Sequence, residues 1–252
     1  MISLHALIEI LDDWMHPEDF SDYAPNGLQI EGRATVRKLA LGVTASAEVI
    51  DGAVQWGADA LLVHHGYFWR NEPQVLIGMK GARVKKLFAN NLSLLAYHLP
   101  LDCHVDFGNN RALLDELRYA DCQPVEGEKG LLWMAMLNPP ETLEMVGKRI
   151  AMVLQREPLL VSSPRGSECI EKLIVCTGGA QDYLGRAAAL GADAYLSGEI
   201  SERTTHEARE LGVHYIAAGH HATERFGIQA LGQKLSSELR LEVAFFDDFN
   251  PA

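Results

Sequence analysis

The chain has 252 residues, of which 48% are hydrophobic and 22% charged, as in an ordinary soluble globular protein with a sizeable core. Its formal net charge of −12 argues against a bulk electrostatic grip on nucleic acid or an anionic membrane, because phosphates are bound by clustered lysine and arginine. A local basic groove stays open as an alternative. Four cysteines without CxxC spacing, and no apolar run of about 18 residues, predict a cytoplasmic protein without membrane spans.

The first predicted element is an amphipathic helix at the N-terminus, with no basic region that would mark a signal peptide. Its apolar residues have the spacing of one helical face: Leu4, Leu7, Ile8, Leu11 and Met15. We expect this face, together with the apolar run 133–136, to offer surface that is buried between subunits.

Strand-like runs rich in valine, leucine and isoleucine then alternate with helical patterns. The strands are predicted at 38–43, 60–63, 93–97, 173–176, 194–197, 213–218 and 242–246, and the helices at 46–56, 79–90, 109–118, 141–154, 181–190, 201–211 and 226–238. This alternation predicts an α/β fold with mixed, largely parallel sheets.

Segment 124–140 interrupts the alternation with proline, glycine and a short apolar run that predicts an extra strand. We place the junction of two halves there, with a first α/β repeat over 1–125 and a second over 126–252. The halves are expected to be intertwined and to share elements.

One pattern occurs twice: an apolar run that ends in a histidine, followed four residues later by a carboxylate. The two pairs are His98 with Asp102 and His220 with Glu224, and the same 122 residues separate their members. Upstream, segment 42–66 resembles 175–199. These matches predict a duplicated βαβ unit.

A further histidine pair, His64 and His65, ends the run ADALLV, and Gly66 allows a sharp turn after it. Taken singly, each motif is explained by a half-buried histidine, a turn aspartate or a helix start. Seven such residues at predicted strand ends favour one metal site instead: His64, His65, His98, Asp102, His220, His221 and Glu224. Imidazole and carboxylate ligands suit zinc, iron, manganese, cobalt or nickel, and seven candidates favour two divalent ions over one.

Several segments together are similar to the Nif-three-like family, also described as GTP cyclohydrolase I type II homologues. They are DYAPNGLQIEG (22–32), GVTAS (42–46), GADALLVHHGYFW (57–69), HLPLD (98–102), GNN (108–110), GADAYLSGE (191–199) and AAGHHATER (217–225). The resemblance covers essentially the whole chain. It implies two intertwined α/β structural repeats, a dinuclear metal centre, and a toroidal hexamer with the metals facing an internal cavity.

Carried over by motif, the resemblance implies five metal ligands, with Glu224 as the bridge between two ions: His64, His65, Asp102, His220 and Glu224. His98 and His221 then become acid/base candidates beside the metals. In the repeat, position 65 aligns with Glu199, which is therefore expected near an asymmetric site.

The resemblance implies hydrolysis of a C–N, amide or phosphate bond by metal-activated water, with the purine ring of GTP as one nucleotide substrate. The chain has no recognisable guanine-binding motif, and Thr177-Gly178-Gly179 is either an anion site at a helix start or a tight turn. Two non-enzymatic interpretations stay open, a metal-handling protein and a ring-shaped regulatory scaffold.

Overall fold

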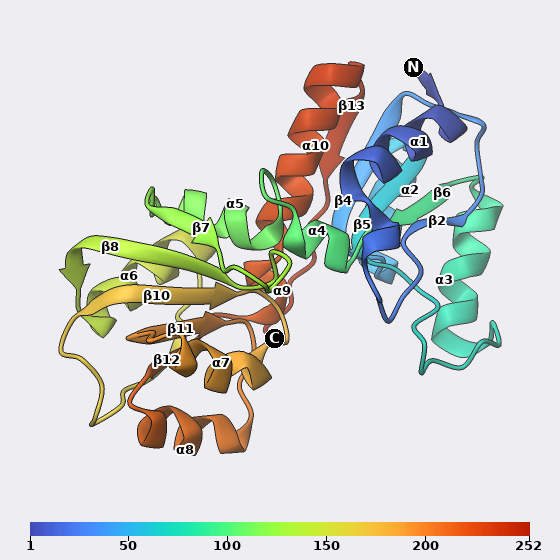
Figure 1. Ribbon diagram of the computed structural model, residues 1–252. Helices are drawn as coiled ribbons and strands as arrows, with labels where there is room; N and C mark the ends of the chain where they lie inside the picture. The colour runs from blue at the N-terminus through green and yellow to red at the C-terminus, as the bar shows by residue number, and fades with distance from the viewer. The chain divides into compact units, whose positions relative to one another are not determined.

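A computed structural model describes residues 1–252, and the chain divides into two compact units. Unit 1 comprises residues 1–101 and 228–249, and unit 2 comprises residues 102–227 and 250–252. Figure 1 colours the chain by residue number and labels its elements. The division of the repeat into 1–125 and 126–252 stays a prediction, because the units are defined by compactness and not by internal similarity.

Unit 1 is built on a five-stranded sheet with the order β13-β4-β5-β6-β2. The strands of this sheet are β2 (Gly27–Ile30), β4 (Lys38–Thr44), β5 (Ala60–His65), β6 (Ser93–Ala96) and β13 (Glu242–Phe245). A separate two-stranded sheet consists of β1 (Ile2–Ser3) and β3 (Thr35–Val36). The helices of unit 1 are α1 (Leu4–Met15), the short η1 (Pro17–Asp19), α2 (Ala47–Trp56) and α3 (Gly78–Ala89). Two further helices, α4 (Leu99–Cys103) and α10 (Arg225–Leu239), each contain a boundary between the units. Strands β13, β4, β5 and β6 run parallel, while β2 is antiparallel to β6 and β1 pairs with β3.

Unit 2 is built on a six-stranded sheet with the order β7-β8-β10-β11-β12-β9. Its strands are β7 (Cys122–Pro124), β8 (Trp133–Glu141), β9 (Leu159–Val161), β10 (Ile170–Cys176), β11 (Ala194–Ser197) and β12 (His214–Ala217). Its helices are α5 (Asn109–Glu116), α6 (Leu143–Leu154), the short η2 (Gln181–Tyr183), α7 (Leu184–Ala189), α8 (Glu202–Leu211) and α9 (His220–Thr223). The three central strands β10, β11 and β12 are parallel, and antiparallel strands flank them.

The mixed α/β fold predicted from the alternation of strands and helices is confirmed. All seven predicted strands and all eight predicted helices, including the N-terminal one, are present, and β8 is the extra strand expected within 124–140. The short strands β2, β7 and β9 have no counterpart in the sequence pattern. Unlike the equally short β6, β11 and β12, which are buried throughout, they are only partly buried and lack a continuous buried apolar run.

The repeat seen in the sequence is also present in the strand register. Leu39 pairs with Ala60 between β4 and β5, and Leu173 pairs with Ala194 between β10 and β11, one repeat further along the chain. The same holds for a carboxylate cap: Asp59 accepts hydrogen bonds from two amides at the start of β4, and Asp193 does so at the start of β10. The two parallel cores therefore share one local design.

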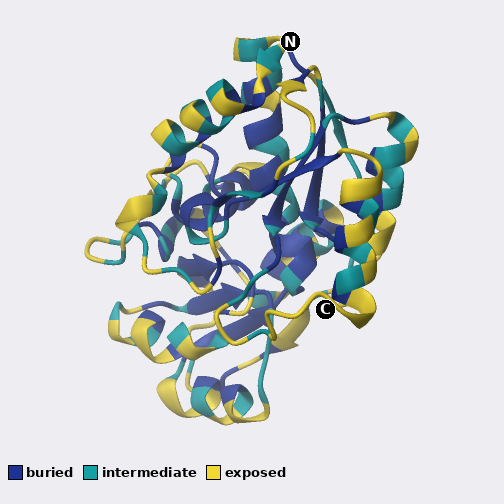
Figure 2. Ribbon diagram, turned by 90° about the vertical axis from the view of Figure 1, so that its right-hand side faces the viewer, coloured by how far each residue is buried: buried dark blue, intermediate teal, exposed yellow.

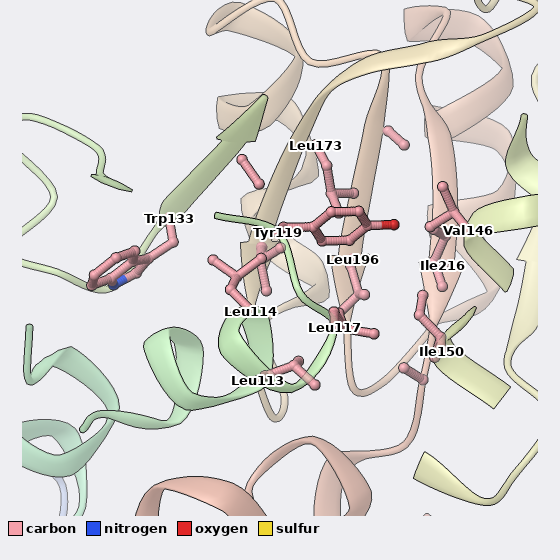
Figure 3. Close-up of a cluster of buried hydrophobic side chains, with 14 of the residues drawn as sticks. Leu113, Leu114, Leu117, Tyr119, Trp133, Val146, Ile150, Leu173, Leu196 and Ile216 are labelled. Atoms are coloured by element: carbon pink, nitrogen blue, oxygen red, sulfur yellow. The ribbon is translucent and has the colours of Figure 1, made fainter. Parts of the chain in front are cut away.

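The core of unit 2 lies on both faces of its sheet, as the alternation of side chains along a strand requires. Leu173 and Val175 of β10 join a cluster with α5 and α6, which Figure 3 shows around Tyr119 and Ile150. The intervening residues of β10, Ile174 and Cys176, join a second cluster with α7 and α8. Figure 2 shows the sheets as the most buried part of the ribbon and the helices as partly exposed.

The apolar surfaces that were expected between subunits are instead buried within the chain. Leu7 and Leu11 of α1 are fully buried in unit 1, and Trp133 is 2% exposed in the core of unit 2. Neither surface is therefore evidence for an oligomer. No helix has both the length and the apolar character needed to cross a membrane.

Candidate metal centre

Strand β5 ends in the two adjacent histidines, His64 and His65. Their ring centroids lie only 4.4 Å apart, although neighbouring side chains on a continuing strand point to opposite faces. The chain leaves the strand directly afterwards at Gly66, where a Cβ atom would lie 2.2 Å from the Gln29 side-chain oxygen. The same atom would lie 2.7 Å from the Ala96 Cβ, so the turn leaves little room for a side chain at this position.

His98, which follows the end of β6, joins this pair to form what we call the histidine cluster: His64, His65 and His98. The ring of His98 lies 5.1 Å from that of His64 and 5.7 Å from that of His65. One ring nitrogen of each of the three lies within 4.8 Å of the others. This spacing brings three potential nitrogen ligands together inside unit 1.

Neighbouring groups hold the rings of the histidine cluster. His64 Nδ1 donates to the Tyr97 carbonyl at 3.0 Å, and His65 Nδ1 lies 3.2 Å from the Thr44 hydroxyl. Metal-binding histidines characteristically hydrogen-bond in this way through the nitrogen that does not bind the ion. With Nδ1 engaged in both rings, coordination would be through Nε2.

Unit 2 contains the second group, which we call the acidic cluster: Asp102, His220 and Glu224. His220 begins α9 just after β12, and Glu224 is the residue that ends this short helix. His220 Nε2 lies 3.2 Å from a carboxylate oxygen of Glu224, and an oxygen of Asp102 lies within 4.8 Å of one of Glu224. Asp102 is 6% exposed and Glu224 only 3%, so two carboxylates are buried beside one imidazole.

Two fully buried asparagines of α5 hold Asp102 in place. The Asn109 amide donates to Asp102 Oδ1 at 2.8 Å, and the Asn110 amide donates to the Asp102 backbone carbonyl at 3.3 Å. A side-chain donor on one carboxylate oxygen leaves the other as the natural metal ligand. Asn109 therefore orients Asp102, a role for which the sequence carried no signal beyond the GNN motif.

Glu199, flagged from the repeat, lies beside His220, with 2.7 Å between its carboxylate and His220 Nδ1. Burial alone would lower the pKa of His220, but the carboxylates of Glu224 and Glu199 raise it to about 9. A carboxylate partner on Nδ1 fixes the ring and increases its basicity as a ligand.

The turn at Thr177-Gly178-Gly179 packs under Glu224. Gly178 has a φ of +70°, and a Cβ atom there would lie 2.1 Å from Glu224 Oε1. The amides of this turn are engaged by the protein, since Thr177 donates to Asn110 Oδ1 and Gly178 to the Thr223 hydroxyl. These bonds favour the tight-turn interpretation over an anion site.

The donor chemistry fits a transition metal bound by nitrogen and oxygen. Imidazole and carboxylate donors suit zinc, iron, manganese, cobalt and nickel. Cys176 is also buried in unit 2, but burial raises the pKa of its thiol well above the usual value, and so do the nearby Asp102 and Cys103. None of the groups of side chains that lie close enough together to hold one ion includes a cysteine, which argues against a thiolate site.

Two of the residues singled out from the sequence, His98 and His221, were expected to act as acid/base groups. His98 lies in the histidine cluster, and its Nδ1 is 2.7 Å from Asp22, a contact that sequence reasoning missed. His221 is buried at 6% exposure in α9, and its backbone amide donates to Ala252. Its acid/base role stays a prediction.

Similarity to other proteins extends over the whole chain. A protein of Allochromatium vinosum named GTP cyclohydrolase 1 type 2 homolog is 49% identical over 252 residues, which cover 100% of this chain and 98% of that protein. A solved structure described as protein ybgI, of unknown function, has a TM-score of 0.94 at 43% identity and covers 100% of both chains. A second solved structure, of a Thermus thermophilus protein, has a TM-score of 0.87 at 31% identity, with the same full coverage.

These similarities agree with the family resemblance read from the motifs HHG, HLPLD and GHHATER. Residues 2–251 match the family described as Duf34/NIF3 (NGG1p interacting factor 3). The chain therefore belongs to the Duf34/NIF3 family.

Proposed function

We propose that this protein binds two divalent metal ions per chain and uses them to hydrolyse a C–N or phosphate bond, in the cytoplasm. The five proposed ligands are His64, His65, Asp102, His220 and Glu224. The observation that carries the proposal is the way neighbouring groups hold these side chains: Nδ1 of each of the three histidines is engaged, and so is Oδ1 of Asp102. We infer that all five residues bind the same pair of ions from the order of their motifs in the sequence.

The residues around the metals divide into ligands and proton carriers. When bound, a divalent ion supplies Lewis acidity and lowers the pKa of a coordinated water toward about 7. Glu224, with two oxygens and 3% exposure, is the proposed bridging ligand. His98 is the proposed group that takes a proton from the attacking water and returns it to the leaving group.

The proposed substrate class is a nucleotide or a related purine. Its support is the name of the relatives, GTP cyclohydrolase 1 type 2 homolog, together with the hydrolytic chemistry of such a donor set. In such a nucleotide, water would hydrolyse either a C–N bond of the ring or a phosphate ester bond.

We also propose a homo-oligomer, a toroidal hexamer, as the functional form. Its support is the family resemblance, along with exposed apolar side chains in the first turn of α3 and just before it: Val75 is 60%, Ile77 73% and Met79 69% exposed. Replacing Ile77 and Met79 together by aspartate should lower the mass measured by light scattering. A monomeric mass for the unchanged protein would contradict the hexamer.

The decisive experiment is a hydrolysis screen with metal-loaded protein. It would cover GTP, oxidised purine nucleotides, simple amides and phosphoesters. Activity should disappear in His65→Ala and His220→Ala, because each side chain holds an ion. In His98→Ala the metal content should stay near that of the unchanged protein while turnover falls by about 10²–10⁴-fold, the usual loss for a general acid or base.

Two outcomes would overturn parts of the proposal. If metal-replete protein turned over no compound in the screen but exchanged its ions readily, a metal-handling role would be the better account. If His98→Ala lost metal and activity in parallel, His98 would be a ligand and not a proton carrier.

A further inference from the structure

Asp22 contributes a buried carboxylate to unit 1, directly beside the histidine cluster. It lies in the loop before β2, and its side chain is 4% exposed. Its Oδ1 is 2.7 Å from His98 Nδ1, although 76 residues separate the two in the chain. The contact is a short carboxylate–imidazole pair.

Other donors converge on the same carboxylate. The backbone amide of Leu99 donates to Oδ2 at 3.0 Å, the Asn26 amide to Oδ2 at 3.0 Å, and the Tyr23 backbone amide to Oδ1 at 2.6 Å. Burial alone would raise the pKa of Asp22, but the bonds from His98, Asn26 and Leu99 hold it well below its usual value. Asp22 is therefore ionised and acts only as an acceptor.

An acceptor at 2.7 Å decides where the imidazole proton resides. Nδ1 of His98 has to carry the hydrogen that Asp22 accepts, so the neutral ring has its lone pair on Nε2. The rest of the residue is held as well. The His98 backbone amide donates to Asn26 Oδ1 at 2.7 Å, and the ring of Trp69 lies edge-on to His98 at 5.0 Å.

His220 provides an informative contrast inside unit 2. Its Nδ1 also meets a carboxylate, that of Glu199, but its Nε2 is 3.2 Å from a second carboxylate, Glu224. Flanked on both sides by acidic groups, His220 has the surroundings of a metal ligand. The pair of His98 with Asp22 is an arrangement found in oriented bases and in metal-binding histidines alike, and the family resemblance places His98 outside the ligand set.

We propose that Asp22 is a positioning residue that locks His98 in the Nδ1–H tautomer and thereby makes Nε2 its proton-accepting atom. This inference rests on the proposed hydrolysis for its chemical purpose. Nε2 would accept a proton from water as the new bond to oxygen forms, and Asp22 would stabilise the resulting imidazolium. The same proton would pass to the leaving group as its bond breaks, which restores the neutral ring.

The test is a measurement of the tautomer by nitrogen-15 NMR on the full-length, histidine-labelled protein. Metal is first removed with a chelator, and spectra are recorded at a pH where imidazole is neutral. Protonated and unprotonated ring nitrogens have distinct chemical shifts, so the spectrum reports the tautomer directly. The unchanged protein should show His98 as the Nδ1–H form alone. Finding the Nε2–H form would overturn the proposal without any variant.

Asp22→Asn should convert His98 to a mixture of tautomers and lower turnover by about 10²–10⁴-fold with metal content retained. Asp12→Asn is the matched control, because Asp12 is another carboxylate of unit 1 that accepts a 2.6 Å bond, from the Tyr97 hydroxyl. It should leave the His98 tautomer unchanged. An unaltered tautomer in Asp22→Asn would contradict the proposal.

Loading with zinc distinguishes the remaining outcomes. His98 Nε2 should keep the chemical shift of an unbound nitrogen, and a metal-bound shift would make His98 a ligand and overturn its role as a base. Because the tautomer is read without turnover, absence of hydrolysis would remove the proposed function while leaving the locked tautomer standing.

Discussion

Units 1 and 2 have parallel cores with matching strand register, but different side chains follow the ends of the strands. Where β5 of unit 1 ends in His64 and His65, β11 of unit 2 is followed by Gly198 and Glu199. The histidine cluster brings together three imidazoles, and the acidic cluster brings together two buried carboxylates and one imidazole. The comparison teaches that two cores with the same strand register can carry different side chains at their strand ends.

The largest expected effect separates the two carboxylates of the acidic cluster. Glu224→Gln should lower metal affinity by more than about 100-fold and remove both ions, because a bridging ligand serves two metals. Asp102→Asn should retain more metal, since it serves one. Elemental analysis after purification without chelator measures both. Equal losses in the two variants would contradict the bridging role of Glu224.

A second prediction concerns the turn under Glu224. Gly178→Ala should push the Glu224 carboxylate away and lower metal affinity by about 10–100-fold, the effect of a lost supporting contact. Gly191→Ala is the matched control in the same unit. Gly191 also has a positive φ, +74°, but its Cβ would meet only the flexible Lys172 amine at 3.6 Å.

Both substitutions should cost unit 2 about 1–2 kcal/mol of stability for the left-handed backbone. Only Gly178→Ala should lose metal, as measured by zinc titration. Equal zinc affinity in the two variants would show that the turn does not support Glu224.

A third prediction follows from the raised pKa of His220, about 9 in the metal-free protein. Because the folded state raises this pKa above its ordinary value of about 6.5, the stabilisation is complete below pH 6.5 and is lost as the pH rises through about 9. The loss should be about 3 kcal/mol, since each pKa unit corresponds to about 1.4 kcal/mol. Hydrogen–deuterium exchange of β10, β11 and β12 at several pH values measures it.

His220→Gln should flatten this pH dependence in unit 2, while the exchange of β4, β5 and β6 in unit 1 should be the same in both proteins. A dependence that survives the substitution would assign the effect to another group.

The smallest expected effect tests what the two units share. Asp59→Asn and Asp193→Asn each replace a carboxylate that accepts hydrogen bonds from two backbone amides at about 2.9–3.0 Å. Each substitution should lower the stability of its own unit by about 1 kcal/mol. The folded state lowers the pKa of both carboxyls, so this stabilisation is lost as the pH falls. Urea unfolding should give similar losses, and clearly unequal ones would argue against a common design.

The sequence predicted the shared core of the two units better than the details at their strand ends. Apolar runs such as 194–197 mark buried strands directly, and the repeat offsets carried over into the strand register. Asp22 had no signal beyond its place in the segment DYAPNGLQIEG, because its partner His98 lies 76 residues away and a hydrogen bond of that kind leaves no periodic pattern. The bond from Asn109 to Asp102 spans only seven residues, but it too leaves no periodic pattern. Composition and spacing in the sequence indicate which segments are buried. They do not indicate how a side chain is oriented, because that depends on contacts formed only in the folded chain.

The position of β13 at the edge of the sheet in unit 1 has a consequence for biosynthesis. β13 pairs with β4, so one edge of β4 stays open until residues 242–245 have left the ribosome. Residues 102–227 of unit 2 are continuous in the chain and can fold earlier during translation. A released chain that ends at residue 241 should therefore contain a protease-resistant unit 2 and an unfinished sheet beside the histidine cluster.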